Sequence, residues 1–351
     1  MVERYIAKWC GRLTLLLGLA VSLAAPAATA LPAATTDASV FEAVRDADGR
    51  LAYIGYRLAR ANVALCDRRE PGLGLQLHTL DQFDDANRAA AARHFSFAAP
   101  VAVEAVVAGS PAARAGIRPD DSLVRVGGVD TAALPGHPNT TERLVAAQLA
   151  IAALPVDAPV VISAIRGGAP ITLTIVPEPI CRTRFELRLG QDFNASADGT
   201  MVQVSARFLQ AYPEPQFAAV VAHEFAHNIL HHRDRLEARG VDYGLLSGFG
   251  ANVKYFRQTE IEADLLSVYL LVNAGIDPRA AVDFWRHFGP SRAGGIFRSR
   301  SHPGWRDRVA TLSAEIGRIA ADTPRPIMPP LVAVRDRPLD GDWQALLVRA
   351  R

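Results

Sequence analysis

The chain has 351 residues, half of them hydrophobic, which is enough to bury a core in each of two domains. Its 38 basic and 36 acidic residues give a net charge of +2, and no basic patch interleaved with aromatic residues stands out. We therefore expect no nucleic-acid partner.

Residues 1–30 have the pattern of a secretory signal peptide. A basic start is followed by a mostly apolar stretch from Leu13 to Ala25, and Ala28-Thr29-Ala30 has the small residues of a cleavage site. The apolar stretch is short for a membrane span. We expect export to the periplasm with the peptide removed. The alternative is an uncleaved anchor, and only then do we expect association with a membrane.

A predicted helix precedes residues 70–178, and two cysteines flank them. Apolar residues recur at helical spacing between Phe41 and Leu65, which predicts a helix. Cys66 and Cys181 are the two cysteines that remain after removal of the signal peptide. An even pair of cysteines in an oxidising compartment predicts a disulfide. Because this bond would close a long loop, it would stabilise the folded protein by roughly 4–5 kcal/mol. The alternative is two buried free thiols.

Residues 70–178 contain short strands, turns and helices. From Ser110 to Asp130 the sequence predicts a short capped helix, a Pro-Asp-Asp turn, a strand and a tight turn at Gly127-Gly128. Thr141 to Ala153 predicts another helix, and a final hairpin is expected around Gly167-Gly168.

This succession resembles a PDZ domain. The resemblance implies that Gly72, Leu73, Gly74 and Leu75 form the loop whose backbone amides receive a C-terminal carboxylate, while the peptide adds as an extra strand. Protein or peptide substrates, bound through their tails, are then the expected partners. The alternative is a structural spacer with an empty or self-filled groove.

The central motif is His-Glu-x-x-His in the apolar, alanine-rich stretch from Phe217 to His232. On a helix, His223 and His227 project from one face about 6 Å apart, so that both imidazoles reach one zinc ion at about 2.0–2.1 Å. Glu224 is then placed to act as general base on a metal-bound water. A core helix with incidental histidines is the alternative, but buried polar side chains need partners.

A second helical pattern runs from Gln258 to Leu271. Glu260 and Asp264 are four residues apart and share a face of that helix, whereas Glu262 points elsewhere. A catalytic zinc usually has three protein ligands and a water, so a third ligand is required. The alternative is that these carboxylates are simply solvated.

Around this helix we expect further elements. Phe185 to Leu189 and Met201 to Val204 alternate as strands around the turn at Ala197-Asp198-Gly199, and Pro278 to Phe288 predicts a helix.

The motifs HEFAH and EIEAD, with Ser301-His302-Pro303 and Arg308 beyond, are together similar to the zinc metallopeptidases that include CAAX prenyl proteases and the HtpX-like enzymes. The resemblance covers about residues 185–320. It implies one Zn²⁺ per chain with Glu260 as the third ligand, and an edge strand at Asn194 to Ala197 along which substrate lies.

The same resemblance implies roles for three more residues. Asp264 supports the ligands, His302 stabilises the oxyanion or transiently caps the zinc, and Arg308 orients His302. A surface position for His302 is the alternative.

The sequence thus predicts an α+β protein with a mainly helical, zincin-like metallopeptidase domain and a small sheet. The expected parts after the signal peptide are a helical segment at 31–69 that belongs to the peptidase domain, the PDZ domain at 70–178, the metallopeptidase domain at 179–323 and a tail at 324–351.

The expected function is that of a zinc metalloendopeptidase of the cell envelope that acts on misfolded or unassembled proteins. One alternative is an envelope chaperone or assembly factor with a weak or latent protease site. Another is a PDZ scaffold with an inactive peptidase fold, against which the intact motifs argue.

Overall fold

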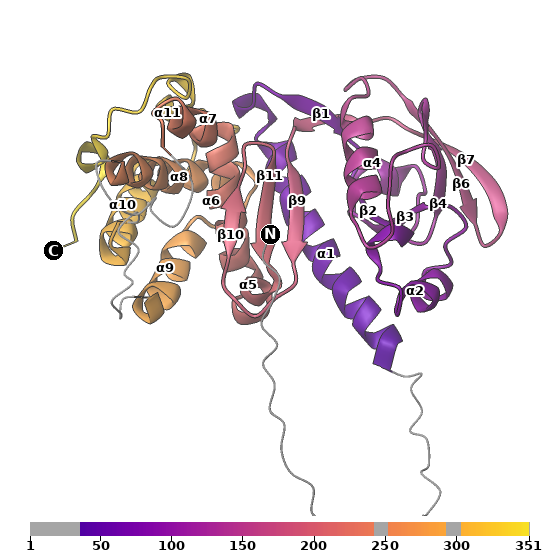
Figure 1. Ribbon diagram of the computed structural model, residues 1–351. Helices are drawn as coiled ribbons and strands as arrows, with labels where there is room; N and C mark the ends of the chain where they lie inside the picture. Colours follow the sequence, from indigo (N-terminus) through magenta and orange to yellow (C-terminus); the bar gives the residue numbers. More distant parts are fainter. Residues whose placement is uncertain (1–35, 242–251, 293–302, 351) are drawn as a thin grey trace, which may run out of the picture. The chain divides into compact units, whose positions relative to one another are not determined.

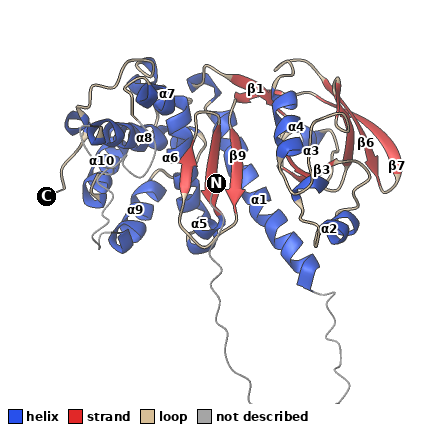
Figure 2. Ribbon diagram, in the orientation of Figure 1, coloured by secondary structure: helices blue, strands red, loops and turns tan. Residues whose placement is uncertain are grey.

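The computed structural model describes residues 36–241, 252–292 and 303–350. The expected signal peptide and His302 lie outside these residues. Within them, the chain is an α+β protein (Figures 1 and 2). A search of the described residues for helices long and apolar enough to cross a membrane finds none.

Residues 70–178, where a PDZ domain is expected, are called the PDZ region below. This region is built on a six-stranded antiparallel sheet with the order β2-β3-β4-β6-β7, in which β5 pairs with β4. Its strands are β2 (Leu75–Thr79), β3 (Val101–Val106), β4 (Ser122–Val126), β5 (Val129–Asp130), β6 (Val160–Arg166) and β7 (Ala169–Ile175). Its helices are η2 (Leu80–Gln82), α2 (Arg88–His94), α3 (Pro111–Arg114) and α4 (Glu142–Ala152).

Alternating side chains from these strands form a core of their own, which includes Leu123, Ile162 and Ile175. The prediction of a final hairpin is confirmed, because β6 and β7 pair along their length and turn at Gly167 and Gly168, both with positive φ.

Two short strands connect this region to the rest of the chain, and Phe41 and Arg45 of the first helix, α1 (Thr36–Ala61), also contact it. Here β1 (Arg69–Gly72) pairs antiparallel with β8 (Glu178–Cys181), next to the short helix η1 (Val63–Leu65). The predicted disulfide is present, with 5.5 Å between the Cα atoms of Cys66 and Cys181.

The peptidase region has a three-stranded sheet with the order β10-β11-β9. Its strands are β9 (Arg184–Arg188), β10 (Ala195–Ala197) and β11 (Met201–Ser205). The predicted strands at 185–189 and 201–204 exist, but they do not pair as a hairpin. β11 runs parallel to β9 and forms its hairpin with β10. The Asp198 carboxylate accepts hydrogen bonds from the backbone amides of Thr200 and Met201, which fixes this turn.

Helices make up most of this region. They are α1 (Thr36–Ala61), α5 (Ala206–Ala211), α6 (Glu214–Ile229), α7 (His232–Glu237), α8 (Val253–Asn273), α9 (Arg279–Arg292), α10 (Trp305–Arg318), α11 (Pro330–Ala333) and η3 (Trp343–Leu346). The central helix α6 packs against β10 and β11 and against α8 and α9 (Figure 1). Leu51, Ile54 and Leu58 of α1 belong to the same core as Phe217 and Phe225 of α6.

The central helix is shorter than its apolar sequence suggests. It ends at Ile229, and His231 adopts a left-handed backbone conformation with φ of 52°, after which α7 starts in a new direction. His232 therefore does not continue the face of α6.

Candidate metal centre

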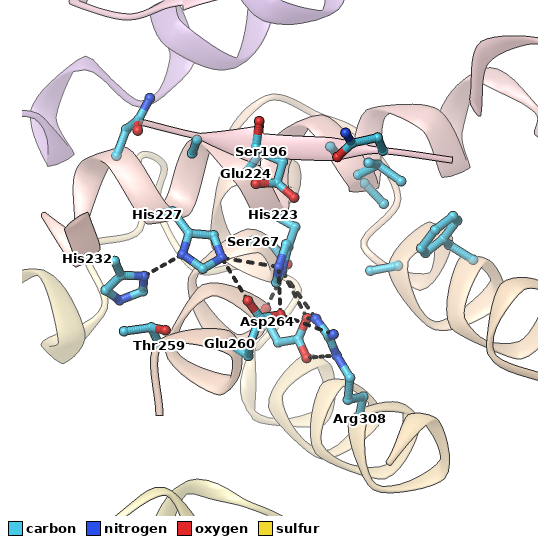
Figure 3. A pocket seen from close by; sticks show the side chains of 18 of the residues that line it. Ser196, His223, Glu224, His227, His232, Thr259, Glu260, Asp264, Ser267 and Arg308 are labelled. Carbon is cyan, nitrogen blue, oxygen red and sulfur yellow. Dashed lines mark hydrogen bonds and ion pairs between the residues drawn. The ribbon is translucent and has the colours of Figure 1, made fainter. Parts of the chain in front are cut away.

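The buried helices α6 and α8 place three potential ligands together. Phe217, Val221 and Phe225 anchor α6 in the core, and its opposite side turns His223 and His227 toward Glu260 of α8 (Figure 3). The Nε2 atoms of the two histidines lie 3.3 Å apart. Glu260 lies 3.4 Å from Nε2 of His223 and 3.6 Å from Nε2 of His227.

These distances suit one tetrahedral metal ion. Ligand atoms at about 2.0–2.1 Å from a tetrahedral zinc lie roughly 3.3–3.4 Å from one another. Among the described residues, His223, His227 and Glu260 are the group of side chains whose donor atoms lie within range of one ion. Two imidazoles and a carboxylate are also the donors that zinc accepts in catalytic sites. The residues present therefore fit a zinc ion.

A buried ion pair supports the first histidine. Nδ1 of His223 lies 3.1 Å from Oδ1 of Asp264. Each oxygen of the Asp264 carboxylate accepts one hydrogen bond of 2.6 Å from Arg308. Arg308 also donates to Glu260 over 3.3 Å. Burial raises the pKa of Asp264, but Arg308 and His223 outweigh burial and hold it below its usual value. Arg308 thus contacts a proposed ligand and its supporting residue directly.

A different set of residues supports the second histidine. Nδ1 of His227 lies 2.8 Å from Nδ1 of His232, whose Nε2 lies 3.0 Å from Glu262. Glu262 in turn accepts a 2.6 Å hydrogen bond from Arg235. Burial and the neighbouring His232 lower the pKa of His227 well below its ordinary value.

Sequence reasoning missed this second group. His232 is five positions after His227, which is off the shared face of a continuous helix, and only the bend at His231 brings the two rings together. The available signal was Glu262 itself, which points away from the face of Glu260 and Asp264 and, on a buried side of the helix, needs a charged partner.

Glu224 faces a cavity of about 370 Å³ beside the ligand cluster. Figure 3 shows Ser196 of the edge strand β10 next to Glu224. Burial and the nearby Glu260 raise the pKa of Glu224 to about 7, although His223 counteracts them. The cavity is also lined by five aromatic side chains, Phe193, Phe208, Phe284, Trp285 and Phe288. The cavity therefore joins a carboxylate suited to proton transfer with an edge strand and a group of aromatic side chains.

The predicted peptide-binding loop of the PDZ region lies elsewhere. Gly72 ends β1, Leu75 begins β2, and the backbone oxygens of Leu73 and Gly74 accept hydrogen bonds from the amides of Ala112 and Val107. All but Gly72 line a second cavity of about 140 Å³, to which residues of α4, α1 and β9 also contribute. The structure thus brings the loop to a groove, but not to the metal centre.

Two family models match the chain. The model of peptidase family M48 matches residues 243–316, which include Glu260, Asp264 and Arg308. The PDZ domain model matches residues 102–149, from β3 to α4. A search of curated proteins gives no match. The two family matches agree with the fold, and a peptidase that carries a PDZ domain implies protein or peptide substrates.

Proposed function

We propose that this chain, with its family M48 metallopeptidase domain and its PDZ domain, is a zinc-dependent endopeptidase. The observation that carries the proposal is the spacing of 3.3–3.6 Å among the donor atoms of His223, His227 and Glu260. Glu224 stands beside this cluster and faces the same cavity. The intact set of donors and base favours hydrolysis over a purely structural metal site.

His223, His227 and Glu260 would hold the zinc ion, which when bound supplies a Lewis acid and an acidic water. Glu224 accepts a proton from the water that attacks the peptide carbonyl and delivers this proton to the leaving amine. The edge strand β10 offers its free side for pairing with an extended substrate segment. This pairing places the substrate backbone across the mouth of the cavity.

We further propose that the protein works in the cell envelope on misfolded or unassembled proteins, and that the PDZ groove recruits their tails. The Cys66–Cys181 disulfide supports an oxidising compartment, because such bonds persist there. The groove beside Gly74 and α4 supports peptide recruitment, because PDZ domains bind peptides as added strands.

The test compares zinc content and casein cleavage in the protein without residues 1–30 and in its Glu224→Gln variant. We expect about one zinc in both proteins and cleavage only in the wild type. Glu237→Gln is the matched control, because Glu237 is exposed and pairs with the exposed Arg233. It should cleave like the wild type.

Zinc in both proteins with cleavage in neither would contradict the peptidase proposal and favour a chaperone or a latent enzyme. Absence of zinc from both would contradict the metal centre. Equal cleavage by wild type and Glu224→Gln would remove Glu224 from its role as general base.

A further inference from the structure

The two histidines of the cluster are supported in different ways. His223 contacts a carboxylate, Asp264, directly. At its Nδ1, His227 instead contacts a third imidazole, His232, over 2.8 Å, and His232 in turn contacts the carboxylate of Glu262. Each of these carboxylates pairs with an arginine, Asp264 with Arg308 and Glu262 with Arg235. Figure 3 shows His232 next to His227, on the side away from Glu260.

His232 and its partner Glu262 are buried, and the Glu262 carboxylate has several hydrogen-bond donors. His232 is 1% exposed, and Glu262 is 5% exposed. The Glu262 carboxylate accepts hydrogen bonds from Arg235 over 2.6 Å and from Gln258 over 2.9 Å, in addition to its contact with His232. A buried carboxylate with an arginine partner is ionised and can only accept hydrogen bonds. The hydrogen in the contact with His232 therefore lies on the histidine.

This fixed acceptor determines the hydrogens along the whole path. Nε2 of His232 donates to Glu262, so its Nδ1 carries a lone pair when the ring is neutral. That lone pair accepts from His227, which must then hold its own hydrogen on Nδ1. The lone pair of His227 is left on Nε2, the atom that faces Glu260 and His223.

We propose that His232, held by Glu262 and Arg235, is a positioning residue that fixes the ring of His227 in the tautomer able to bind zinc through Nε2. The inference rests on the proposed metal centre and deepens it. The bend at His231 is what makes the arrangement possible, since its left-handed backbone turns His232 back toward His227. The helix break thus belongs to the site.

The experiment measures the zinc dissociation constant by competition with a chromophoric chelator. His232→Phe keeps a ring but removes both nitrogens, and we expect it to weaken zinc binding by about 10- to 100-fold. In His232→Gln the amide oxygen accepts from His227 while the amide nitrogen donates to Glu262. We expect this variant to recover most of the affinity. His287→Phe is the control, because His287 is exposed and its ring contacts Gln216, which is outside the cluster.

A second measurement needs no variant. Nitrogen NMR of the metal-free wild type should show the hydrogen of His227 on Nδ1 and that of His232 on Nε2. The opposite tautomer of His227 would overturn the inference even if His232→Phe failed to fold.

The outcomes separate the two proposals. Equal zinc affinity in the wild type and in a folded His232→Phe would overturn the role of His232 and leave the peptidase intact. Equal weakening by Phe and Gln would also overturn it, because bulk rather than hydrogen bonding would then matter. A wild type that binds no zinc would overturn the metal centre and this inference with it.

Discussion

Arg308 holds Asp264 through two parallel hydrogen bonds of 2.6 Å, from Nε to Oδ2 and from Nη2 to Oδ1, across 44 residues of sequence. The guanidinium is 1% exposed and also contacts Glu260 and the face of Trp285, 3.7 Å from the ring centroid. This paired geometry explains why an arginine, rather than a lysine, suits the position.

Replacing Arg308 by Met should lower the free energy of unfolding by about 3–5 kcal/mol, because Asp264 would become a buried carboxylate without its arginine. Lys should not restore the loss, since it cannot form both hydrogen bonds. Urea unfolding of the metal-free proteins checks both expectations. Arg318→Met removes an exposed arginine from the same helix and should cost little. A loss below about 1 kcal/mol in Arg308→Met would refute the importance of the pair.

The disulfide should contribute about 2–5 kcal/mol to stability, since it closes a sequence separation of 115 residues. Urea unfolding with and without a reducing agent measures this contribution in the wild type. The double variant Cys66→Ala, Cys181→Ala serves as the control, and reductant should leave its unfolding midpoint unchanged. If reductant left the wild type unchanged as well, the two cysteines would be free thiols in solution.

Acid should destabilise the protein through His78. This side chain is fully buried among aromatic rings, 4.7 Å from Phe95 and 4.6 Å from Phe97 between ring centroids. Neither of its ring nitrogens has a hydrogen-bond partner among the residues that the structure describes. Burial, aided by the charge of Arg45, lowers its pKa from 6.5 to about 3.

His78 therefore becomes protonated near pH 6.5 in the unfolded chain, but only near pH 3 in the folded chain. Stability is unaffected above pH 6.5 and falls as the pH decreases through this window, by about 2 kcal/mol at pH 5. His78→Leu should remove this loss, which unfolding at pH 7.5 and pH 5 would show. The same change at His137, which is 77% exposed, should leave the pH dependence unaltered. An equal acid loss in His78→Leu and the wild type would disprove the assignment.

Gly74→Ala should damage the predicted peptide-binding loop. Gly74 has φ of 77°, and an added Cβ would collide with the side chain of Ser110, which caps α3 by accepting a hydrogen bond from Ala113. Gly109 has a similar φ of 72° with open space around it, so Gly109→Ala measures backbone strain alone, about 1–2 kcal/mol.

The difference between the two alanine variants isolates the collision. Hydrogen exchange at β2 and α3 should show greater loss of protection in Gly74→Ala than in Gly109→Ala. Equal losses would mean that Ser110 moves aside freely.

The sequence predicted those features that depend on short-range spacing. His223 and His227 are four residues apart, as are Glu260 and Asp264, so spacing alone places each pair on one face of its helix. The approach of the two faces, at 3.4 Å from His223 to Glu260, was implied only by the family resemblance.

Features that depend on a break in regularity escaped prediction. Nothing in the spacing of His232 announces the left-handed residue before it, so its contact with His227 was not anticipated. The pairing of the small sheet failed for a related reason. Alternation identifies a strand but not its neighbour, and Met201 to Ser205 pairs in parallel with Arg184 to Arg188 rather than in a hairpin.

The pairing of β1 with β8 has a consequence for how such a chain is assembled. Cys66 and Cys181 belong to the core of the peptidase region, and their Cα atoms are only 5.5 Å apart. The 114 residues between the two cysteines therefore leave the peptidase region and return to it at adjacent positions. The chain can therefore be interrupted here without cutting the core of the peptidase region, and a replacement domain would also have to cover Phe41 and Arg45 of α1.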